Sequence, residues 1–229
     1  MLVPSDPLAA FLANIGYSIC HQLPSRSLFL GGYQLPFCAR DTGTYLAFTV
    51  VMGYYLVTKS KRGVKLFDRY VLVACLIGLG LYAFDALSSY AGLRSTSNEI
   101  RLLSGLAFGA MAGFLLTSVA SIVLLRSKTT SPSYTWRDLP PVYLAIAVAG
   151  ALVLVDTGVA GWYAFSVVID AGYLVFLFLI VAIVVAVATG WDLVTKTKRK
   201  LVTTSILLEI AVIVLLWLVH YLVGTPILD

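Results

Sequence analysis

Long hydrophobic runs alternate with short polar stretches along the whole of this 229-residue chain. A run such as "YLVFLFLIVAIVVAVATG" is apolar all around a helix, which is typical of membrane-spanning helices and not of amphipathic helices on a soluble core. Most of the runs are close to the roughly 20 residues that a spanning helix needs. The pattern predicts seven helical segments, at residues 7–20, 42–58, 70–91, 102–125, 141–160, 164–189 and 201–223. The first segment is short, so a re-entrant or interfacial helix is the alternative to a span.

Composition agrees with this pattern, since 60% of the residues are hydrophobic and only 12% are charged. Soluble globular domains contain about a quarter charged residues. The loops leave no room for a separate soluble domain. We therefore expect an all-α, polytopic transmembrane bundle that forms a single integral domain over residues 1–229 and crosses the cell membrane several times.

The basic residues predict the orientation of this bundle. Residues 59–69 contain five Lys and Arg, residues 126–138 contain three, and residues 196–200 contain four. All three loops follow even-numbered segments, so the positive-inside rule assigns them to the cytoplasm. The formal charge of +5 then reflects topology, and we expect no nucleic-acid partner. Tryptophans at segment ends are predicted to be interfacial anchors, namely Trp136, Trp162 and Trp191.

The loop between the first two segments carries candidate metal ligands. In "CHQLPSRSLFLGGYQLPFCARDTG", Cys20 and His21 precede the loop, and Cys38 and Asp41 open the second segment. Cys, His and carboxylate together suit zinc or a similar divalent metal, although adjacent Cys20 and His21 do not easily share one ion. A Cys20–Cys38 disulfide is the first alternative, because an external loop permits oxidation. The second is a pair of buried cysteines beside a helix-capping Asp41.

Ionisable residues also lie inside the apolar segments, mainly in their predicted outer halves. Such groups are costly unless they are paired or solvated, so each is a candidate functional residue. The alternative is that they form ion pairs between packed helices. The set comprises Asp85, Asp156, Asp170, Glu209 and His220.

The fourth segment begins with a helix-start signal and continues with a glycine face. "TSNE" predicts a capping box of Thr96 and Glu99. Glycines then recur at four-residue spacing below Arg101, at positions 105, 109 and 113, as in closely packed membrane helices. A small and polar stripe around Asp85 in the third segment is the expected partner of this face, which predicts an Asp85–Arg101 ion pair.

The same region also predicts an anion site. Arg94, Asn98 and Arg101 surround a helix N-terminus, whose free N–H groups favour phosphate or carboxylate. Arg26 and Arg40 approach from the preceding external loop. An ion pair and an anion site therefore remain as two interpretations of these arginines.

Three quoted stretches together resemble a family. "CHQLPSRS", "GGYQLPFCARDTG" and "GLRSTSNEIRLLSGLAFG", with an Asp in the third segment, are similar to an uncharacterised family of predicted bacterial and archaeal integral membrane proteins. Its members read CHQ-x-P-x-R-S-F, P-V-C-A-R-C-T-G and G-x-R-x-S-T-N-x-x-R. The resemblance covers about the first 115 residues and brings no established activity. It implies that these positions are signature positions: Cys20, His21, Arg26, Cys38, Arg40, Asp85, Arg94, Asn98 and Arg101. The family's second cysteine of C-A-R-C is Asp41 here, an exchange that a metal site tolerates and a redox pair does not.

Two functions follow as expectations. The first is a metal-dependent enzyme of the outer leaflet that acts on a phosphate-bearing lipid or polyprenyl substrate. Its metal ligands would be Cys20, His21, Cys38 and Asp41, its catalytic carboxylates Asp41 and Asp85, and its anion-binding residues Arg26, Arg40, Arg94, Asn98 and Arg101. The second is an ion, proton or anion transporter that uses the intramembrane acidic residues.

Overall fold

The computed structural model describes residues 2–58, 68–125 and 132–223. In these ranges the chain is mostly helical, as predicted. The helices are α1 (Pro7–Tyr17), α2 (Ala39–Thr58), α3 (Arg69–Tyr90), α4 (Asn98–Val123), α5 (Leu139–Leu154), α6 (Gly158–Thr189) and α7 (Lys198–Val223). Two short 3-10 helices, η1 (Pro24–Arg26) and η2 (Trp136–Asp138), and two strands, β1 (Ser27–Leu30) and β2 (Tyr33–Cys38), complete the described elements.

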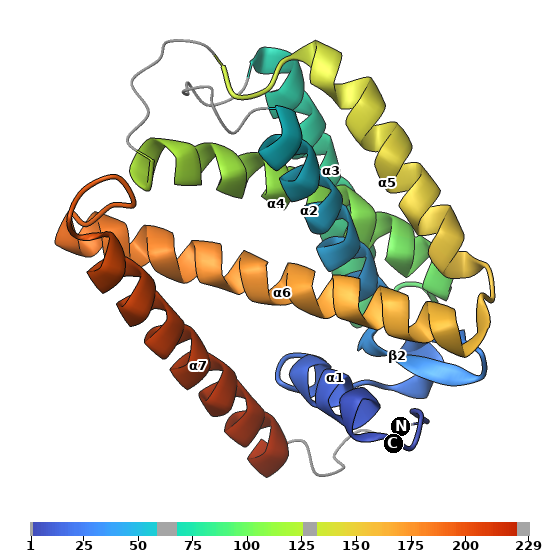
Figure 1. Ribbon diagram of the computed structural model, residues 1–229. Coiled ribbons are helices and arrows are strands. Elements are labelled where there is room, and N and C mark those ends of the chain that lie inside the picture. Colours follow the sequence, from blue (N-terminus) through green and yellow to red (C-terminus); the bar gives the residue numbers. More distant parts are fainter. Residues whose placement is uncertain (1, 59–67, 126–131, 224–229) are drawn as a thin grey trace.

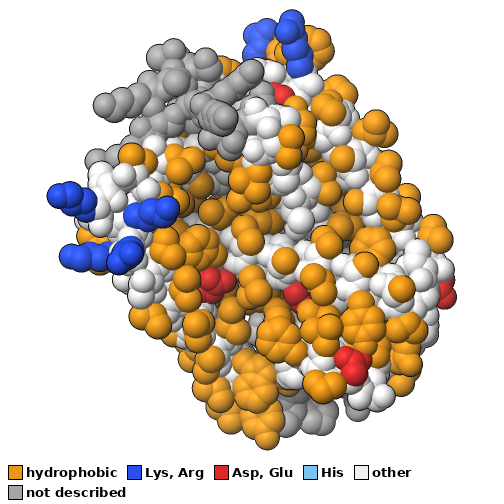
Figure 2. Space-filling view, in the orientation of Figure 1, with side chains coloured by type: hydrophobic (Ala, Val, Ile, Leu, Met, Phe, Trp, Pro, Cys, Tyr) orange, Lys and Arg blue, Asp and Glu red, His pale blue; other side chains and the backbone are white. Residues whose placement is uncertain are grey.

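Five of the described helices are long and apolar enough to cross a membrane: α3, α4, α5 together with η2, α6 and α7. Their outward surfaces carry many exposed Leu, Ile and Val side chains, and Figure 2 shows a face covered mostly by hydrophobic atoms with Lys and Arg at its edge. With 11 residues, α1 is only about 16 Å long, which is half of a bilayer core. The structure therefore favours the interfacial or re-entrant alternative for the first segment.

A β-hairpin lies between α1 and α2, where the sequence predicted only a loop. Strands β1 and β2 pair antiparallel and are joined by Gly31 and Gly32, which have φ values of 58° and 78°. Two consecutive positive φ values belong to the tight turns that suit β-hairpins. A Cβ on Gly31 would lie 2.6 Å from the Val159 backbone nitrogen, so the hairpin turn packs directly against the start of α6.

Asp156 and Trp162 form hydrogen bonds with the hairpin. Neither residue lies where the sequence predicted it. Asp156 lies in the turn between α5 and α6 instead of inside a span, and its carboxylate accepts from the Gly31 N–H at 2.6 Å and from the Gly158 N–H at 3.0 Å. The hydrogen bond from Gly31, and to a smaller extent that from Gly158, lowers the pKa of the Asp156 carboxyl group. Trp162 is completely buried and donates to the Gln34 carbonyl at 2.8 Å, so its prediction as an interfacial anchor was wrong.

The predicted glycine face of α4 exists, but it packs against α2 instead of the Asp85 stripe of α3. A Cβ on Gly105 would lie 1.9 Å from the Arg40 carbonyl oxygen, and one on Gly109 would lie 2.0 Å from that of Thr44. On another side of α4, Gly78 of α3 approaches the Ala107 carbonyl in the same way, at 2.7 Å. The backbones of α2 and α4 therefore touch, which fixes α2 relative to α4 near the candidate site.

The helix-start signal of α4 is displaced by one residue from its prediction. Ser97, not Thr96, is the N-cap, and its hydroxyl accepts from the Ile100 N–H at 3.4 Å. The Glu99 side chain hydrogen-bonds with Ser97.

The bundle has two distinct ends (Figure 1). At the hairpin end, defined by residues 27–38, α1 and the hairpin pack against α6. At the basic end, defined by residues 190–200, the turn between α6 and α7 carries four Lys and Arg. Of the other predicted basic loops, 59–69 and 126–138, residues 59–67 and 126–131 lie outside the described ranges.

Candidate functional site

Three of the four predicted metal ligands converge where α1, β2 and α2 meet. Cys20 follows α1, Cys38 ends β2, and Asp41 lies in the first turn of α2. The Cys38 N–H donates to Cys20 Sγ at 3.1 Å, and the Cys38 thiol donates to Asp41 Oδ2 at 3.3 Å. One ligand atom from each residue lies within 4.8 Å of the other two. Both cysteines are free thiols, so the structure contains the cluster and not the alternative disulfide.

The spacing of this cluster fits a small cation after a modest closure. Zinc bonds of roughly 2.0–2.3 Å put tetrahedral ligand atoms roughly 3.3–3.8 Å apart. Cys38 Sγ and Asp41 Oδ2 are already 3.3 Å apart, and the other pairs lie within 4.8 Å, so Cys20 would have to approach by at most about 1 Å. The pKa of the Cys38 thiol is raised, first by its interaction with Cys20 and then by burial and the Asp41 carboxylate. Cation binding would therefore displace a thiol proton from Cys38.

His21, the fourth predicted ligand, does not join this cluster. Its ring is exposed and lies 4.3 Å from the ring of His220 in α7, measured between centroids. Residues 20–23 have no regular secondary structure, and Gln22 has a φ of 51°. Cys20 is buried whereas His21 is exposed, so His21 lies apart from the other three predicted ligands in this structure.

Asp85 is the centre of a buried ion cluster beside the metal candidates. It is 2% exposed, and its Oδ2 accepts from Arg40 Nη2 at 2.7 Å, Arg40 Nε at 3.1 Å and Ser104 Oγ at 2.8 Å. Its Oδ1 accepts from Arg94 Nη2 at 2.6 Å. Both oxygens are thus engaged by guanidinium groups, which makes Asp85 a group that positions arginines and a poor proton acceptor.

Arg101 makes a different contact from the one predicted. Its Nη1 donates to Asn98 Oδ1 at 3.0 Å, and Asn98 Nδ2 donates in turn to the Ser27 carbonyl of β1 at 3.0 Å. The prediction of an Asp85–Arg101 ion pair was wrong, because Arg40 and Arg94 occupy the Asp85 carboxylate. Within the described ranges, no acidic side chain forms a salt bridge with Arg101.

The predicted anion-binding residues gather in one place. Arg101 lies within electrostatic reach of Arg26, Arg40, Cys38 and Asp85. The guanidinium groups of Arg26 and Arg40 lie 5.9 Å and 5.6 Å from the centre of the exposed Tyr90 ring. Arg40 and Arg94 therefore contact the buried Asp85 carboxylate, and Arg26 and Arg101 lie near Arg40 without contacting that carboxylate.

The other predicted intramembrane groups lie elsewhere. Asp170 in α6 is 2% exposed, and neither of its carboxylate oxygens has a hydrogen-bond partner among the described residues. Glu209 of α7 lines a pocket between α6 and α7. His220 Nδ1 donates to the Tyr17 carbonyl at 2.6 Å, and the two rings stack.

Several polar residues that the sequence did not single out hold the site together. Ser104 donates to Asp85, and Ser88 accepts from Arg94 Nε at 2.9 Å. Gln22, with a φ of 51°, donates to the carbonyls of Ala13 and Pro36 at 2.7 Å each and so joins α1 to β2. Serine is common in loops and helices, and no local signal distinguishes Ser88 and Ser104, whereas Gln22 belongs to the quoted "CHQLPSRS" stretch.

The fold and this polar cluster define the class: a helical protein with five helices long and apolar enough to cross a membrane and with thiol, carboxylate and arginine groups gathered at the hairpin end. Comparison with known proteins agrees, because residues 20–115 match the family described as "Predicted membrane protein (DUF2085)". The chain is also 33% identical over 101 residues to "Uncharacterized protein MJ1492" of Methanocaldococcus jannaschii. That match covers 44% of this chain and 63% of the archaeal protein, so the chain spans less than two thirds of its relative. No solved structure matches the chain.

Proposed function

We propose that this protein is a membrane-embedded, metal-dependent enzyme that acts on a phosphate-bearing lipid at its hairpin end. Cys20, Cys38 and Asp41 hold a zinc-type divalent cation, and the neighbouring arginines bind the phosphate. The observation that supports this most is that ligand atoms of the three side chains lie within 4.8 Å of one another, beside the arginine cluster.

The donor set supports a borderline metal and leaves a coordination position open. Two thiolates and one carboxylate suit zinc better than magnesium or calcium, which prefer oxygen ligands alone. Three protein ligands are the number found in catalytic zinc sites, where the fourth position takes water or substrate. Such a metal would polarise a phosphoryl oxygen or the attacking water.

The arginine cluster supports an anion as substrate. Asp85 forms salt bridges with Arg40 and Arg94 and holds both in fixed positions. Arg26 and Arg101 form no salt bridge with an acidic side chain among the described residues. Arg26 is exposed and Arg101 is partly exposed, so a ligand can reach both. Fixed guanidinium groups bind phosphate oxygens strongly and stabilise charge that develops during phosphoryl chemistry. Asn98 orients Arg101.

A lipid is the favoured source of that phosphate because of where the site lies. The cluster is at the hairpin end of apolar helices, which is the level of lipid head groups if these helices cross a bilayer. The positive-inside rule assigns the basic end to the cytoplasm and hence the site to the opposite side.

Elemental analysis of the detergent-purified protein tests the metal. We expect about one zinc per chain in the wild type and in Cys75→Ser, a matched control in the first half of α3. We expect the metal to be lost in Cys20→Ser, Cys38→Ser and Asp41→Asn. A metal-free wild type, or a metal content that these three substitutions leave unchanged, would contradict the proposal.

Thermal unfolding with added short-chain phosphatidate tests the anion. A ligand that binds the folded state raises the melting temperature, so we expect a rise for the wild type and for Arg69→Gln, in which an exposed arginine at the start of α3 is replaced. Arg101→Gln should abolish the rise. Inorganic phosphate added in parallel separates a lipid site from a phosphate site, and short-chain phosphatidylcholine controls for the acyl chains. Equal stabilisation of the wild type and Arg101→Gln would overturn the anion site.

Transport is the second candidate, and Asp170 is the observation that favours it. A buried carboxyl group without a hydrogen-bond partner is costly in a membrane protein unless an ion or proton occupies it. Asp85 and Asp156, however, are engaged by arginines and by turn N–H groups, so they do not extend a relay. Proton or cation flux into proteoliposomes that Asp170→Asn abolishes would favour transport over the enzyme.

A further inference from the structure

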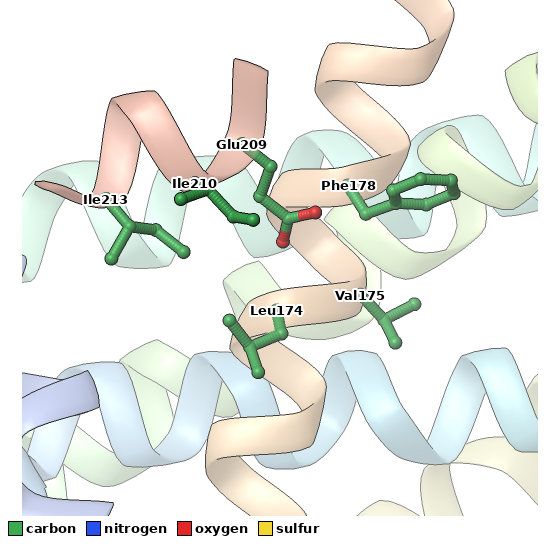
Figure 3. A pocket seen from close by; sticks show the side chains of 6 residues that line it. All are labelled: Leu174, Val175, Phe178, Glu209, Ile210 and Ile213. Carbon is green, nitrogen blue, oxygen red and sulfur yellow. The ribbon is translucent and has the colours of Figure 1, made fainter. Parts of the chain in front are cut away.

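A pocket between α6 and α7 lies far along the chain from the cysteine and arginine site. Its lining residues are Leu174, Val175 and Phe178 of α6, and Glu209, Ile210 and Ile213 of α7, and its volume is about 340 Å³. Figure 3 shows that the Glu209 side chain reaches from α7 toward α6 near Phe178. Five of the six lining side chains are hydrocarbon, so Glu209 is the single ionisable group on this lining.

The pocket lies in the middle of α7 because this helix is fastened mainly at its two ends. At the basic end, Leu201 is completely buried against residues of α6. At the other end, His220 hydrogen-bonds with the Tyr17 carbonyl and stacks on the Tyr17 ring, with 4.3 Å between centroids. In the most apolar 18-residue stretch of α7 only 6% of the residues are buried, compared with 56% for α4. The helix pair is therefore open toward the surrounding lipid around Glu209.

Glu209, as a whole residue, is 9% exposed and forms no hydrogen bond or salt bridge with the described residues. It is the twelfth residue of a 26-residue helix, so it lies near the middle of the span, where an unpaired carboxylate is costly. Lipid chains can fill the apolar volume but cannot pair with the carboxylate. A molecule that satisfies both halves of the site needs a cationic group and a hydrocarbon body. The Phe178 ring adds to this preference, since aromatic faces attract cations.

We propose that the pocket between α6 and α7 is a binding site for small lipophilic cations. Glu209 is the counter-ion, and the apolar lining contacts the hydrocarbon part of the ligand. The ligand enters sideways from the lipid, because the pocket lies half-way along the helices. This site is independent of the proposed metal and phosphate site, and it lies outside residues 20–115, the part that matches the family.

A matched pair of probes tests this proposal. The probes 4-phenylbutylamine and 4-phenylbutanol share one hydrocarbon body and differ in the cationic head group, and both are smaller than the pocket. Titration calorimetry of the full chain in lipid nanodiscs, corrected with protein-free nanodiscs, measures their binding. We expect saturable binding of the amine at one site, at least tenfold tighter than that of the alcohol. Glu209→Gln should remove this preference, whereas Glu99→Gln, which neutralises an exposed carboxylate outside the pocket, should keep it.

A second variant keeps the test informative if Glu209→Gln does not fold. Ile213→Trp adds bulk to the pocket without changing charge, and it should weaken both probes by at least tenfold. The proposal is overturned if the amine and the alcohol bind equally, or if Glu209→Gln or Ile213→Trp binds the amine like the wild type. It is also overturned if the wild type forms a dimer that Glu209→Gln dissociates, because the pocket is then a contact between two copies of the chain.

Discussion

At the scale of single residues, the arginines of the site differ in whether they contact a carboxylate. The Asp85 carboxylate accepts four hydrogen bonds, three of them from guanidinium groups, and thereby holds Arg40 and Arg94 in place. Among the described residues, the Arg101 guanidinium donates one side-chain hydrogen bond, to the amide oxygen of Asn98. The two neighbouring groups therefore differ: Asp85 is committed to the fold, and Arg101 remains available to a ligand.

This difference predicts unequal costs of substitution. Asp85→Asn leaves Arg40, which is 7% exposed, without a buried counter-charge and should cost about 3–5 kcal/mol of unfolding free energy. Arg101→Gln removes one hydrogen bond to a neutral group and should cost about 1 kcal/mol. Denaturant unfolding of both variants in the same detergent measures the two costs. An Arg101→Gln variant as unstable as Asp85→Asn would mean that Arg101 has a structural counter-ion after all.

Sequence reasoning located the residues of this cluster but not its pairs. Cys20, Cys38 and Asp41 could be grouped because they flank one loop, and the hairpin closes that loop. The two arginines that contact Asp85 are Arg94, in the loop after α3, and Arg40, at the start of α2. Helical periodicity does not predict that these two side chains point toward Asp85. His21 was misplaced for a similar reason, since the path of residues 20–23 is set by Gln22 contacts that no local pattern indicates.

At the scale of elements, backbone contact between α2 and α4 sets the geometry of the site. Arg40 and Asp41 start α2, and Asn98 and Arg101 start α4, so these side chains stay together only if the two helices remain in close contact. Their glycines permit this approach because they lack a Cβ. The hydrophobic runs predicted all seven helices, and the four-residue glycine spacing predicted close packing. The partner helix could not be predicted, because spacing identifies a face and not what lies against it.

Two glycine substitutions separate packing from helix propensity. In Gly109→Ala the new Cβ would lie 2.0 Å from the Thr44 carbonyl oxygen, so α2 and α4 must move apart. We expect a cost of about 1–3 kcal/mol from this overpacking and a loss of zinc, because Asp41 moves with α2. In Gly80→Ala, the matched control on α3, the new Cβ meets nothing within 4 Å. It should stabilise the helix by up to about 1 kcal/mol. Thermal melts and zinc content measure both effects, and a Gly109→Ala variant that behaves like Gly80→Ala would contradict close packing as the determinant of the site.

At the scale of the whole molecule, polar chemistry is distributed unevenly between the two ends of the bundle. The hairpin end holds the Cys20 and Cys38 thiols, the arginine cluster and the two histidine rings. The basic end carries Lys196, Lys198, Arg199 and Lys200 around its α6–α7 turn. Positive charge retained on the cytoplasmic side is the general rule for membrane proteins. The distribution therefore predicts a site that faces away from the cytoplasm.

Cysteine labelling in intact cells tests this orientation. A cysteine placed at Lys198 should be shielded from a membrane-impermeant thiol reagent. One placed at Ser97 should react, because Ser97 is exposed and precedes Asn98, which contacts the hairpin. Cysteines near Lys61 or Lys128, which lie outside the described residues, should be shielded like the one at Lys198. The unmodified chain, which contains Cys20, Cys38 and Cys75, supplies the background signal. Reactive positions at 198 and shielded positions at 97 would place the arginine cluster in the cytoplasm. A soluble phosphate compound would then replace the outer-leaflet lipid as the expected substrate, while the metal test and the Glu209 pocket would be unaffected.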